Sequence, residues 1–214
     1  MAEHDPTRGM GLLAAVMEPH QGGHDEFNDW YDLEHLGHMS GIPGVLTATR
    51  FVVVDGWPSY LALYDLDSVS ILSSEGYRSV TGGRFSPWSR RILQSVRGWR
   101  RLTFSQSTPG RAALDPRCGA IDLLLVAPGA ESATASGLRD LPGTLQVRTF
   151  QPAAGGPGAI LVESASLASP TPVDLAAALG PDGARALRWS ARAVRYTRGD
   201  PLAAFSRLEA DGSP

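Results

Sequence analysis

The sequence predicts an α+β fold built from two βαββαβ units in tandem. In the first half, apolar runs and turn signals alternate in the order strand, helix, strand, strand, helix, strand. The second half begins this order again, and the segment IPGVL at 42–46 returns as LPGTL at 141–145, which is 142 − 43 = 99 positions later. Each Pro-Gly turn also precedes an apolar strand by 17 positions (60 − 43 and 159 − 142). These repeated intervals indicate an internal duplication.

Turn residues separate the elements of the first half. The apolar run at 10–17 predicts a buried strand, Gly22-Gly23 breaks the chain after it, and Asp25 is a plausible N-cap for a helix. Pro43-Gly44 and Asp55-Gly56 bound the strand that follows. The remaining segments are strands at 45–54, 60–66 and 97–104, a helix at 68–80 and a further helical turn or two at 88–96.

The second half repeats the pattern with less chemistry. Strands are expected at 119–127, 145–150, 159–166 and 188–197, with an alanine-rich helix that begins at 174–179. The segment 130–140, where a first helix belongs, is short and poor in apolar residues. We therefore divide the chain into a first unit at 10–106, a turn-rich linker at 107–118, a degenerate second unit at 119–199 and a tail at 200–214.

Composition and charge exclude several function classes. The net charge of −3 gives no general attraction to nucleic acid or to an acidic membrane. All 19 basic residues are arginine, so Schiff-base, pyridoxal and P-loop lysine chemistry are absent. No apolar run approaches the roughly 20 residues that span a bilayer. With one cysteine, Cys118, and no secretory signal, the expected location is the cytoplasm.

The string F-x-x-W-Y-x-x-E-H at 27–35, followed by I-P-G at 42–44 and a strand that ends A-T-R-F at 48–51, resembles the EthD-like members of the dimeric α/β-barrel superfamily. The strand YLALYDL at 60–66 also resembles that group. The resemblance covers roughly residues 10 to 105. It implies two ferredoxin-like units whose antiparallel sheets pair as a barrel. Such units usually dimerise, so this pairing is expected either within the tandem chain or in a homodimer through the barrel sheets.

A candidate site lies on the predicted helix that starts near Asp25. Helical spacing places on one face Phe27, Trp30, Tyr31, Glu34 and His38, with His35 on the shoulder of that face. A helix C-terminus and a neighbouring carboxylate both favour the imidazolium form of histidine. A histidine tuned near neutral pH is suited to proton transfer.

The resemblance implies a functional role for the helix histidine that matches His35. Two simpler interpretations remain open: a histidine near a helix end often only caps carbonyls, and an aromatic stripe is usually core. Gly37 could end the helix and place His38 in a loop, and Glu34 could be a pairing carboxylate instead of a catalytic acid. A metal site is not expected, because His35-x-x-His38 lacks the H-E-x-x-H pattern and a defined third ligand.

Tyr60 and Tyr64 share one face of their strand, because their spacing is even. A tyrosine that faces the helix histidine would supply an acid and a base across a small apolar cleft. The alternative is that this face packs and the phenols only reach solvent or a partner. Tyr64 is the tyrosine that we assign to the site.

We therefore predict a cofactor-independent acid/base enzyme that acts on a small apolar, aromatic or polyketide-like compound. The resemblance implies cyclisation, dehydration, decarboxylation or oxidation of such compounds. The predicted catalytic residues are His35, Tyr64 and His38, and the predicted pocket residues are Phe27, Trp30, Tyr31 and Glu34. The alternative is a non-catalytic module that binds a small ligand or a partner, which the histidine-free second half favours. A closed apolar pocket that contains His35 would favour the enzyme.

Overall fold

Eight strands close into one antiparallel barrel in the computed structural model of the chain, which describes residues 9–197. The strands are β1 (Gly11–Glu18), β2 (Val45–Asp55), β3 (Tyr60–Leu66), β4 (Arg97–Thr108), β5 (Ala120–Val126), β6 (Thr144–Pro152), β7 (Gly158–Ser164) and β8 (Leu187–Arg195). The order around the barrel is β1-β3-β2-β8-β5-β7-β6-β4. The α+β prediction is confirmed.

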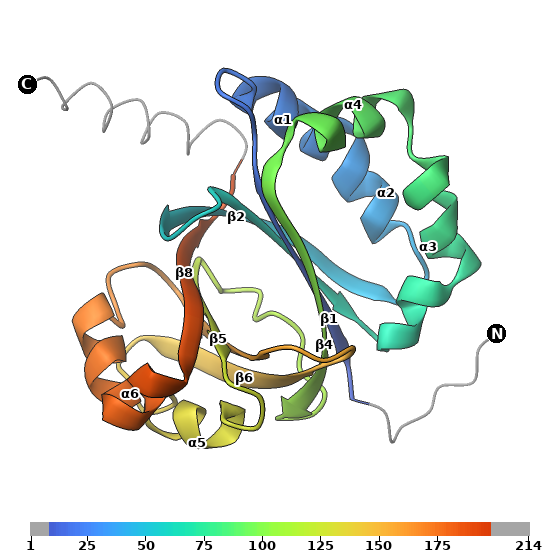
Figure 1. The fold of residues 1–214 in the computed structure, drawn as a ribbon. Helices are drawn as coiled ribbons and strands as arrows, with labels where there is room; N and C mark the ends of the chain where they lie inside the picture. Colours follow the sequence, from blue (N-terminus) through green and yellow to red (C-terminus); the bar gives the residue numbers. More distant parts are fainter. Residues whose placement is uncertain (1–8, 198–214) are drawn as a thin grey trace, which may run out of the picture.

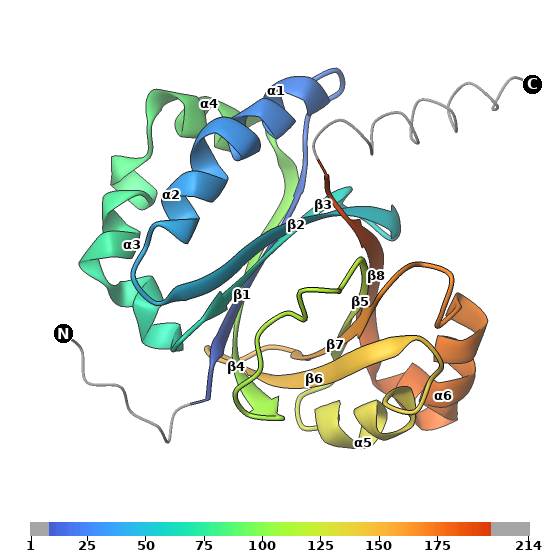
Figure 2. The same ribbon diagram turned by 180° about the vertical axis from the view of Figure 1, so that it is seen from behind.

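Helices cover the barrel on two opposite sides (Figures 1 and 2). One side carries α1 (His24–Trp30), a π-helical turn (Tyr31–His35), α2 (Leu36–Ser40), a 3₁₀ turn (Val69–Ser73), α3 (Glu75–Ser79), a second 3₁₀ turn (Gly82–Arg84) and α4 (Pro87–Ser95). The other side carries α5 (Glu131–Ala135), a 3₁₀ turn (Ser136–Leu138) and α6 (Pro172–Ala186). Within residues 9–197, none of these helices has the length and apolar character to cross a membrane.

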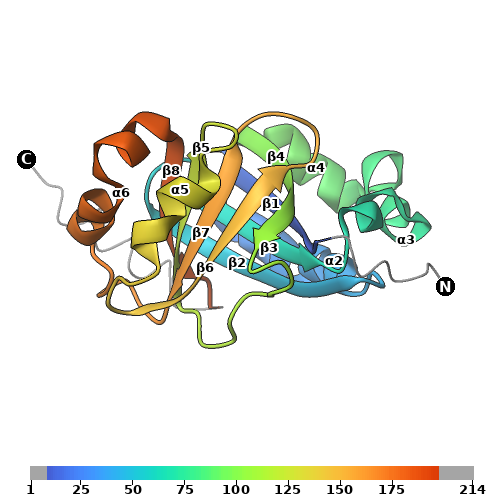
Figure 3. The ribbon, with the colours of Figure 1, turned by 90° about the horizontal axis from the view of Figure 1, so that it is seen from below.

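The barrel closes within a single chain. The pairs β2–β8 and β4–β6 are antiparallel and join the strands of the first half to those of the second (Figure 3). The strands of the first half follow the order β4-β1-β3-β2, and those of the second half follow β8-β5-β7-β6. Among the described strands no sheet edge remains unpaired, so a homodimer through the barrel sheets is not how this barrel is completed.

Several boundaries differ from the prediction for local reasons. The helix predicted at 68–80 is interrupted, because Ser68 and Ser74 each accept a capping hydrogen bond and start separate short helices. The strand predicted to end at residue 104 continues to Thr108, and so it enters the segment predicted as a linker. The tail predicted at 200–214 lies outside the described residues.

Side chains of β1 alternate between two separate cores. Leu12, Ala14 and Val16 belong to the core inside the barrel, whereas Leu13 and Ala15 belong to the core between the strands and the first-half helices. This alternation follows from the two-residue period of a strand. The barrel interior is therefore filled, and the candidate residues of the helix face the outer surface of the sheet.

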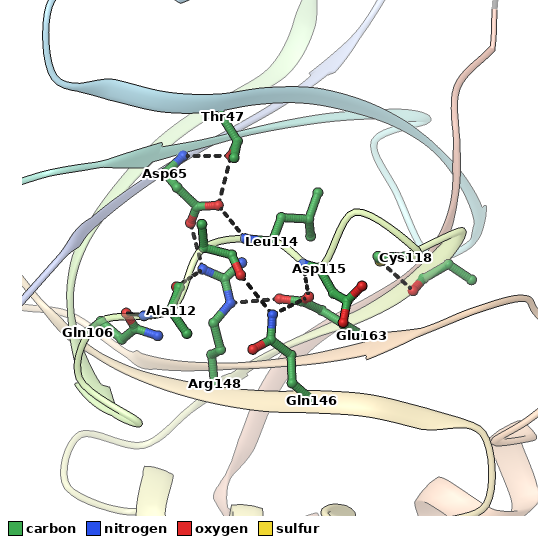
Figure 4. Close-up of polar contacts among 12 residues, drawn as sticks. Thr47, Asp65, Gln106, Ala112, Leu114, Asp115, Cys118, Gln146, Arg148 and Glu163 are labelled. Carbon is green, nitrogen blue, oxygen red and sulfur yellow. Dashed lines mark hydrogen bonds and ion pairs between the residues drawn. The ribbon is translucent and has the colours of Figure 1, made fainter.

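A buried ionic network in the barrel interior joins the two halves to the segment between them (Figure 4). Arg148 on β6 is 0% exposed and donates to Asp65 on β3 and to Glu163 on β7, at 2.6 Å each. The backbone N–H groups of Leu114 and Asp115 donate to the same two carboxylates, at 2.8 Å each. Because these contacts use most of the polar atoms, we interpret the cluster as structural.

Candidate functional site

A small apolar pocket lies between the outer face of the first-half strands and the helices that cover it. It is lined by Leu13, Ala15, Met17, His35, Met39, Tyr64, Tyr77, Thr81, Phe85, Leu93, Trp99 and Arg101. Its volume is ≈ 50 Å³, which is room for one or two water molecules at about 30 Å³ each. The pocket brings together two of the predicted catalytic residues, His35 and Tyr64.

His35 reaches this pocket because the helix widens at Tyr31–His35. There the backbone N–H of Leu36 donates to the carbonyl of Tyr31, five residues earlier, as in a π-helix. A π-turn adds one residue to a turn, so every later side chain falls about 100° behind its regular α-helical position. His35 and Met39 consequently point at the sheet and are buried. They take the inward positions that regular α-helical spacing would give to Glu34 and His38.

Two predicted site residues therefore lie outside the pocket. His38 is exposed on α2, because the π-turn rotates it away from the sheet. Glu34 accepts hydrogen bonds from Ser86 Oγ at 2.6 Å and from Ser89 Oγ at 2.9 Å. Burial raises the pKa of Glu34, but these hydrogen bonds outweigh it and the net pKa is lowered. Glu34 connects the π-turn to the start of α4.

The environment of His35 favours the neutral imidazole. The ring is 8% exposed, stacks on the Trp30 indole and meets the Tyr31 ring edge to face, with centroids 4.4 and 5.2 Å away. Burial lowers the pKa of His35 to about 4 and exceeds the opposing effect of the Glu34 carboxylate. The expectation that His35 is an imidazolium is therefore wrong. It rested on the position of His35 in the helix, which does not show that the ring is buried away from water.

Tyr64 presents a buried hydroxyl to the same pocket. Its side chain is 1% exposed, and the hydroxyl makes no hydrogen bond of ordinary geometry, although the Tyr31 phenol lies close enough to affect it. Burial, together with that neighbouring phenol, raises the pKa of Tyr64 well above its usual value. The hydroxyl is therefore protonated and has a hydrogen to donate.

The three predicted aromatic pocket residues lie behind the pocket, in the adjoining core. Phe27, Trp30 and Tyr31 are all buried, and their rings contact one another with centroids 4.7 to 5.8 Å apart. The Trp30 indole N–H donates to Ser89 Oγ at 3.0 Å. These rings do not line the pocket themselves, and Trp30 and Tyr31 hold His35 in place.

Arg50 is not among the predicted site residues; it lies in the A-T-R-F segment and is buried beside the helix. Its guanidinium donates to Asp32 Oδ1 at 2.8 Å and to Asn28 Oδ1 at 2.5 Å. It also lies over the rings of Tyr31 and Tyr196, 4.4 and 4.0 Å from their centroids. A single arginine in a strand of alternating residues does not indicate burial. Its place in the A-T-R-F motif is the one sequence feature that could have pointed to Arg50.

Arg101 is the one formally charged side chain among the pocket-lining residues. Its Nε donates to the hydroxyl of Tyr77 at 3.0 Å, and its guanidinium lies 5.4 Å from the Tyr77 ring centroid. Arg101 is exposed, so the charged group lies where the pocket borders solvent. Among residues 9–197, no three His, Cys, Asp or Glu side chains gather where they could hold a metal ion.

Comparison with known proteins finds no family that matches the chain and no curated protein that matches it by sequence. Solved structures do match. An anthrone oxidase-like protein aligns with a TM-score of 0.58 and 11% identity, over 89% of this chain and 92% of that protein. A variant of chlorite dismutase from Candidatus Nitrospira defluvii aligns with a TM-score of 0.56 and 10% identity, over 92% of this chain and 96% of that one.

A heme-binding protein from Thermus thermophilus aligns with a TM-score of 0.54 and 11% identity, over 92% of this chain and 95% of that protein. At such low identity, the likeness establishes the fold and nothing further. The structural neighbours are proteins of the dimeric α/β-barrel superfamily, and this chain has their fold.

Proposed function

We propose that this chain is a cofactor-independent acid/base enzyme that acts on a small apolar, aromatic or polyketide-like compound in the pocket of His35 and Tyr64. One observation carries the proposal: a neutral imidazole and a buried phenol without a hydrogen bond of ordinary geometry line the same apolar pocket. Buried titratable groups with shifted pKa values in a cleft are typical of functional sites. The enzyme-like fold of the neighbours is consistent with this interpretation.

In the proposed proton transfer, His35 removes a proton from an acidic C–H or O–H bond of the substrate. The electron pair of that bond moves onto the substrate oxygen, which becomes an enolate or phenolate. Tyr64 donates its hydroxyl hydrogen bond to this oxygen and stabilises the developing charge. The negative charge formed in the pocket in turn stabilises the imidazolium, which offsets the low pKa of His35. Cyclisation and dehydration can begin with this step, and oxidation can follow it when dioxygen accepts electrons from the enolate. In a decarboxylation, loss of CO₂ would itself leave the enolate; the Tyr64 hydrogen bond would stabilise it, and His35 would have no proton to remove.

Arg101 supports a substrate whose polar group is acidic. The other lining side chains are apolar or uncharged at neutral pH, so the pocket as a whole favours a ligand with negative rather than positive charge. An apolar body would occupy the space over Leu13 and Ala15, with its oxygen towards Arg101 or Tyr64.

The pocket volume of ≈ 50 Å³ is smaller than an aromatic substrate requires, since pockets for such ligands measure about 300–1,000 Å³. Three lining residues come from the segment between β3 and α4: Tyr77 lies in α3, and Thr81 and Phe85 flank the 3₁₀ turn Gly82–Arg84. These helices of three to five residues are the natural element to move outward when substrate enters. We therefore assign the segment 75–85 as the entrance of the site.

One of the similar structures is a heme-binding protein, so haem is a candidate cofactor for this fold. The residues of the His35 pocket do not fit it. A haem iron needs an axial His, Cys, Met or Tyr ligand beside a porphyrin-sized cavity. His35 lines a pocket of ≈ 50 Å³, and residues 119–197 contain no histidine. No step of the proposed reaction passes through a haem.

Two finer relationships belong to the same proposal. We infer that the first half is EthD-like, on the motif at 27–35 and the strand at 48–51. We also infer that the chain arose as a tandem duplication of a ferredoxin-like unit. The equal strand orders β4-β1-β3-β2 and β8-β5-β7-β6 support the duplication, as does the Pro-Gly turn that recurs after 99 positions (142 − 43).

The test is a screen followed by substitution. Aromatic and polyketide-like compounds, with anthrone among the first, are screened for thermal stabilisation and then for turnover. For a converted compound, His35→Gln should lower kcat/KM by about 10²-fold or more, as loss of a general base does. Tyr64→Phe should lower kcat more than it raises KM. His38→Gln is the matched control, and its kcat/KM should stay within about threefold of the wild type.

Full activity of His35→Gln would refute the mechanism.

The second candidate function is a non-catalytic module that binds a small ligand. The histidine-free second half favours it, because residues 119–197 supply no imidazole for a second acid/base site. The same screen separates the two: a compound that stabilises the protein and is recovered unchanged, in the presence of oxygen and over a range of pH, identifies a binding module.

A further inference from the structure

A second cleft lies on the opposite half of the barrel, at the seam where β8 joins β2. It is formed by α6 together with the outer faces of β2, β5 and β8, and its volume is ≈ 160 Å³. This volume holds about five groups of water size, at roughly 30 Å³ each. The sequence predicted an unequipped second half, yet this cleft contains buried charge.

Three charged side chains form a row across the strands under the cleft. Asp55 on β2 pairs in register with Arg192 on β8, and Arg192 pairs in register with Asp122 on β5. All three line the cleft. Two carboxylates stand against one guanidinium, so the row carries a net negative charge of one when both acids are ionised.

The hydrogen-bonding capacity of this row is unevenly used. The Nη2 of Arg192 donates to the carbonyls of Leu167 and Pro170, and its Nη1 faces Asp122 at 3.4 Å. Asp122 is 5% exposed, and within residues 9–197 its carboxylate makes this long contact and no shorter one. Charge-assisted hydrogen bonds normally measure about 2.7–2.9 Å. The Asp122 carboxylate can therefore accept further hydrogen bonds in the cleft, whereas most donors of the Arg192 guanidinium are already used.

Apart from Ser190, the rest of the cleft is apolar. Leu175 and Leu179 of α6 face Leu124 and Leu187 of the strands, and α6 places no charged side chain against Asp122. Burial raises the pKa of Asp122 to about 6, with Asp55 raising it further and Arg192 lowering it. The carboxylate is thus mostly ionised at pH 7.5 and mostly neutral at pH 5.

We propose that this cleft binds a small organic amine in its cationic form, with the ammonium group on Asp122 and an apolar body of four or five carbons against α6. The ammonium supplies the donors that Asp122 lacks, and its positive charge matches the net charge of the row. The apolar walls favour an alkyl or cyclic body over a bare metal ion, for which two carboxylates alone are a poor ligand set.

The test uses n-butylamine, 1-butanol and butyrate, which share chain length and differ in charge. Their binding to the full chain is measured by saturation-transfer NMR titration at pH 7.5. We expect butylamine to bind at least tenfold more tightly than the other two compounds. Its affinity should fall severalfold between pH 7.5 and pH 5, because Asp122 gains a proton.

Substitutions locate the binding. Asp122→Asn should weaken butylamine binding at least tenfold, whereas Asp182→Asn, on the exposed side of α6, should leave it within twofold. Ala176→Phe places a ring at the cleft without altering charge and should also abolish binding, so it serves if Asp122→Asn fails to fold. Equal affinity for butylamine and butanol refutes the proposal, and so does unchanged binding in Ala176→Phe. His35→Gln should have no effect, so the two proposals fail independently.

Discussion

The imidazole of His35 lies on the indole of Trp30 with ring centroids 4.4 Å apart and an interplanar angle of 20°. This stacking covers one face of the imidazole, and Tyr31 meets the ring at 82° from another side. The remaining surface of His35 lines the pocket. The aromatic helix face thus determines both the orientation of the histidine and its protonation state.

The first prediction concerns stability in acid. The pKa of His35 is about 4 in the folded chain, against roughly 6.5 when unfolded. Protons therefore bind the unfolded state first, and stability falls as the pH drops from about 6.5 to about 4, by up to ~3 kcal/mol. Above pH 6.5 His35 contributes no pH dependence.

Urea unfolding of the wild type and of His35→Leu across that pH range measures this contribution. The difference in unfolding free energy between the two proteins should shift in favour of the variant as the pH falls. His38→Leu serves as the exposed control. A constant difference from pH 7 to pH 4 would mean that the imidazole is not buried in its neutral form.

The second prediction concerns the buried network of Figure 4. Arg148→Met leaves the carboxylates of Asp65 and Glu163 buried without their cation. We expect a loss of about 3–5 kcal/mol in unfolding free energy. Arg185→Met, in an exposed pair with Asp182 whose atoms are 3.5 Å apart, should change stability little. A loss below about 1 kcal/mol for Arg148→Met would contradict the assigned role of this network.

The third prediction concerns Arg50, which joins α1 to β2. Arg50→Lys keeps the charge but removes the two-armed contact with Asp32 and Asn28 and the stacking on Tyr31. Chemical denaturation should record a loss of about 1–3 kcal/mol. The same exchange at exposed Arg100 should be neutral. If Arg50→Lys is as neutral as Arg100→Lys, the positive charge at position 50 is sufficient, and the two-armed contact and the stacking add nothing to stability.

The fourth prediction separates a structural from a catalytic Glu34. Glu34→Gln weakens the hydrogen bonds from Ser86 and Ser89, so it should cost roughly 1 kcal/mol of stability. For any compound that the protein converts, kcat should stay within about threefold of the wild type, unlike the roughly 10²-fold loss of a general acid. Asp29→Asn, an exposed change one turn earlier, is the control. A large loss of kcat with an unchanged melting temperature would return Glu34 to the catalytic site.

The sequence by itself determined the alternation of strands and helices, because that alternation depends on local periodicity and turn residues. The apolar run at 10–17, the turn at Pro43-Gly44 and the strand at 60–66 each carry a local signal that the structure reproduces within a residue or two. The aromatic character of the helix face was also readable, since Phe27 and Trp30 are core residues at helical spacing.

The tertiary structure alone decided which imidazole enters the pocket and in which charge state. The π-turn at Tyr31–His35 has no sequence signal, and it exchanges His38 for Met39 on the inward face. The neutral form of His35 results from desolvation under Trp30, which depends on packing and not on neighbours in sequence. Likewise, the row of Asp55, Arg192 and Asp122 forms only when β8 lies between β2 and β5, since strand pairing brings together residues that are far apart in the chain.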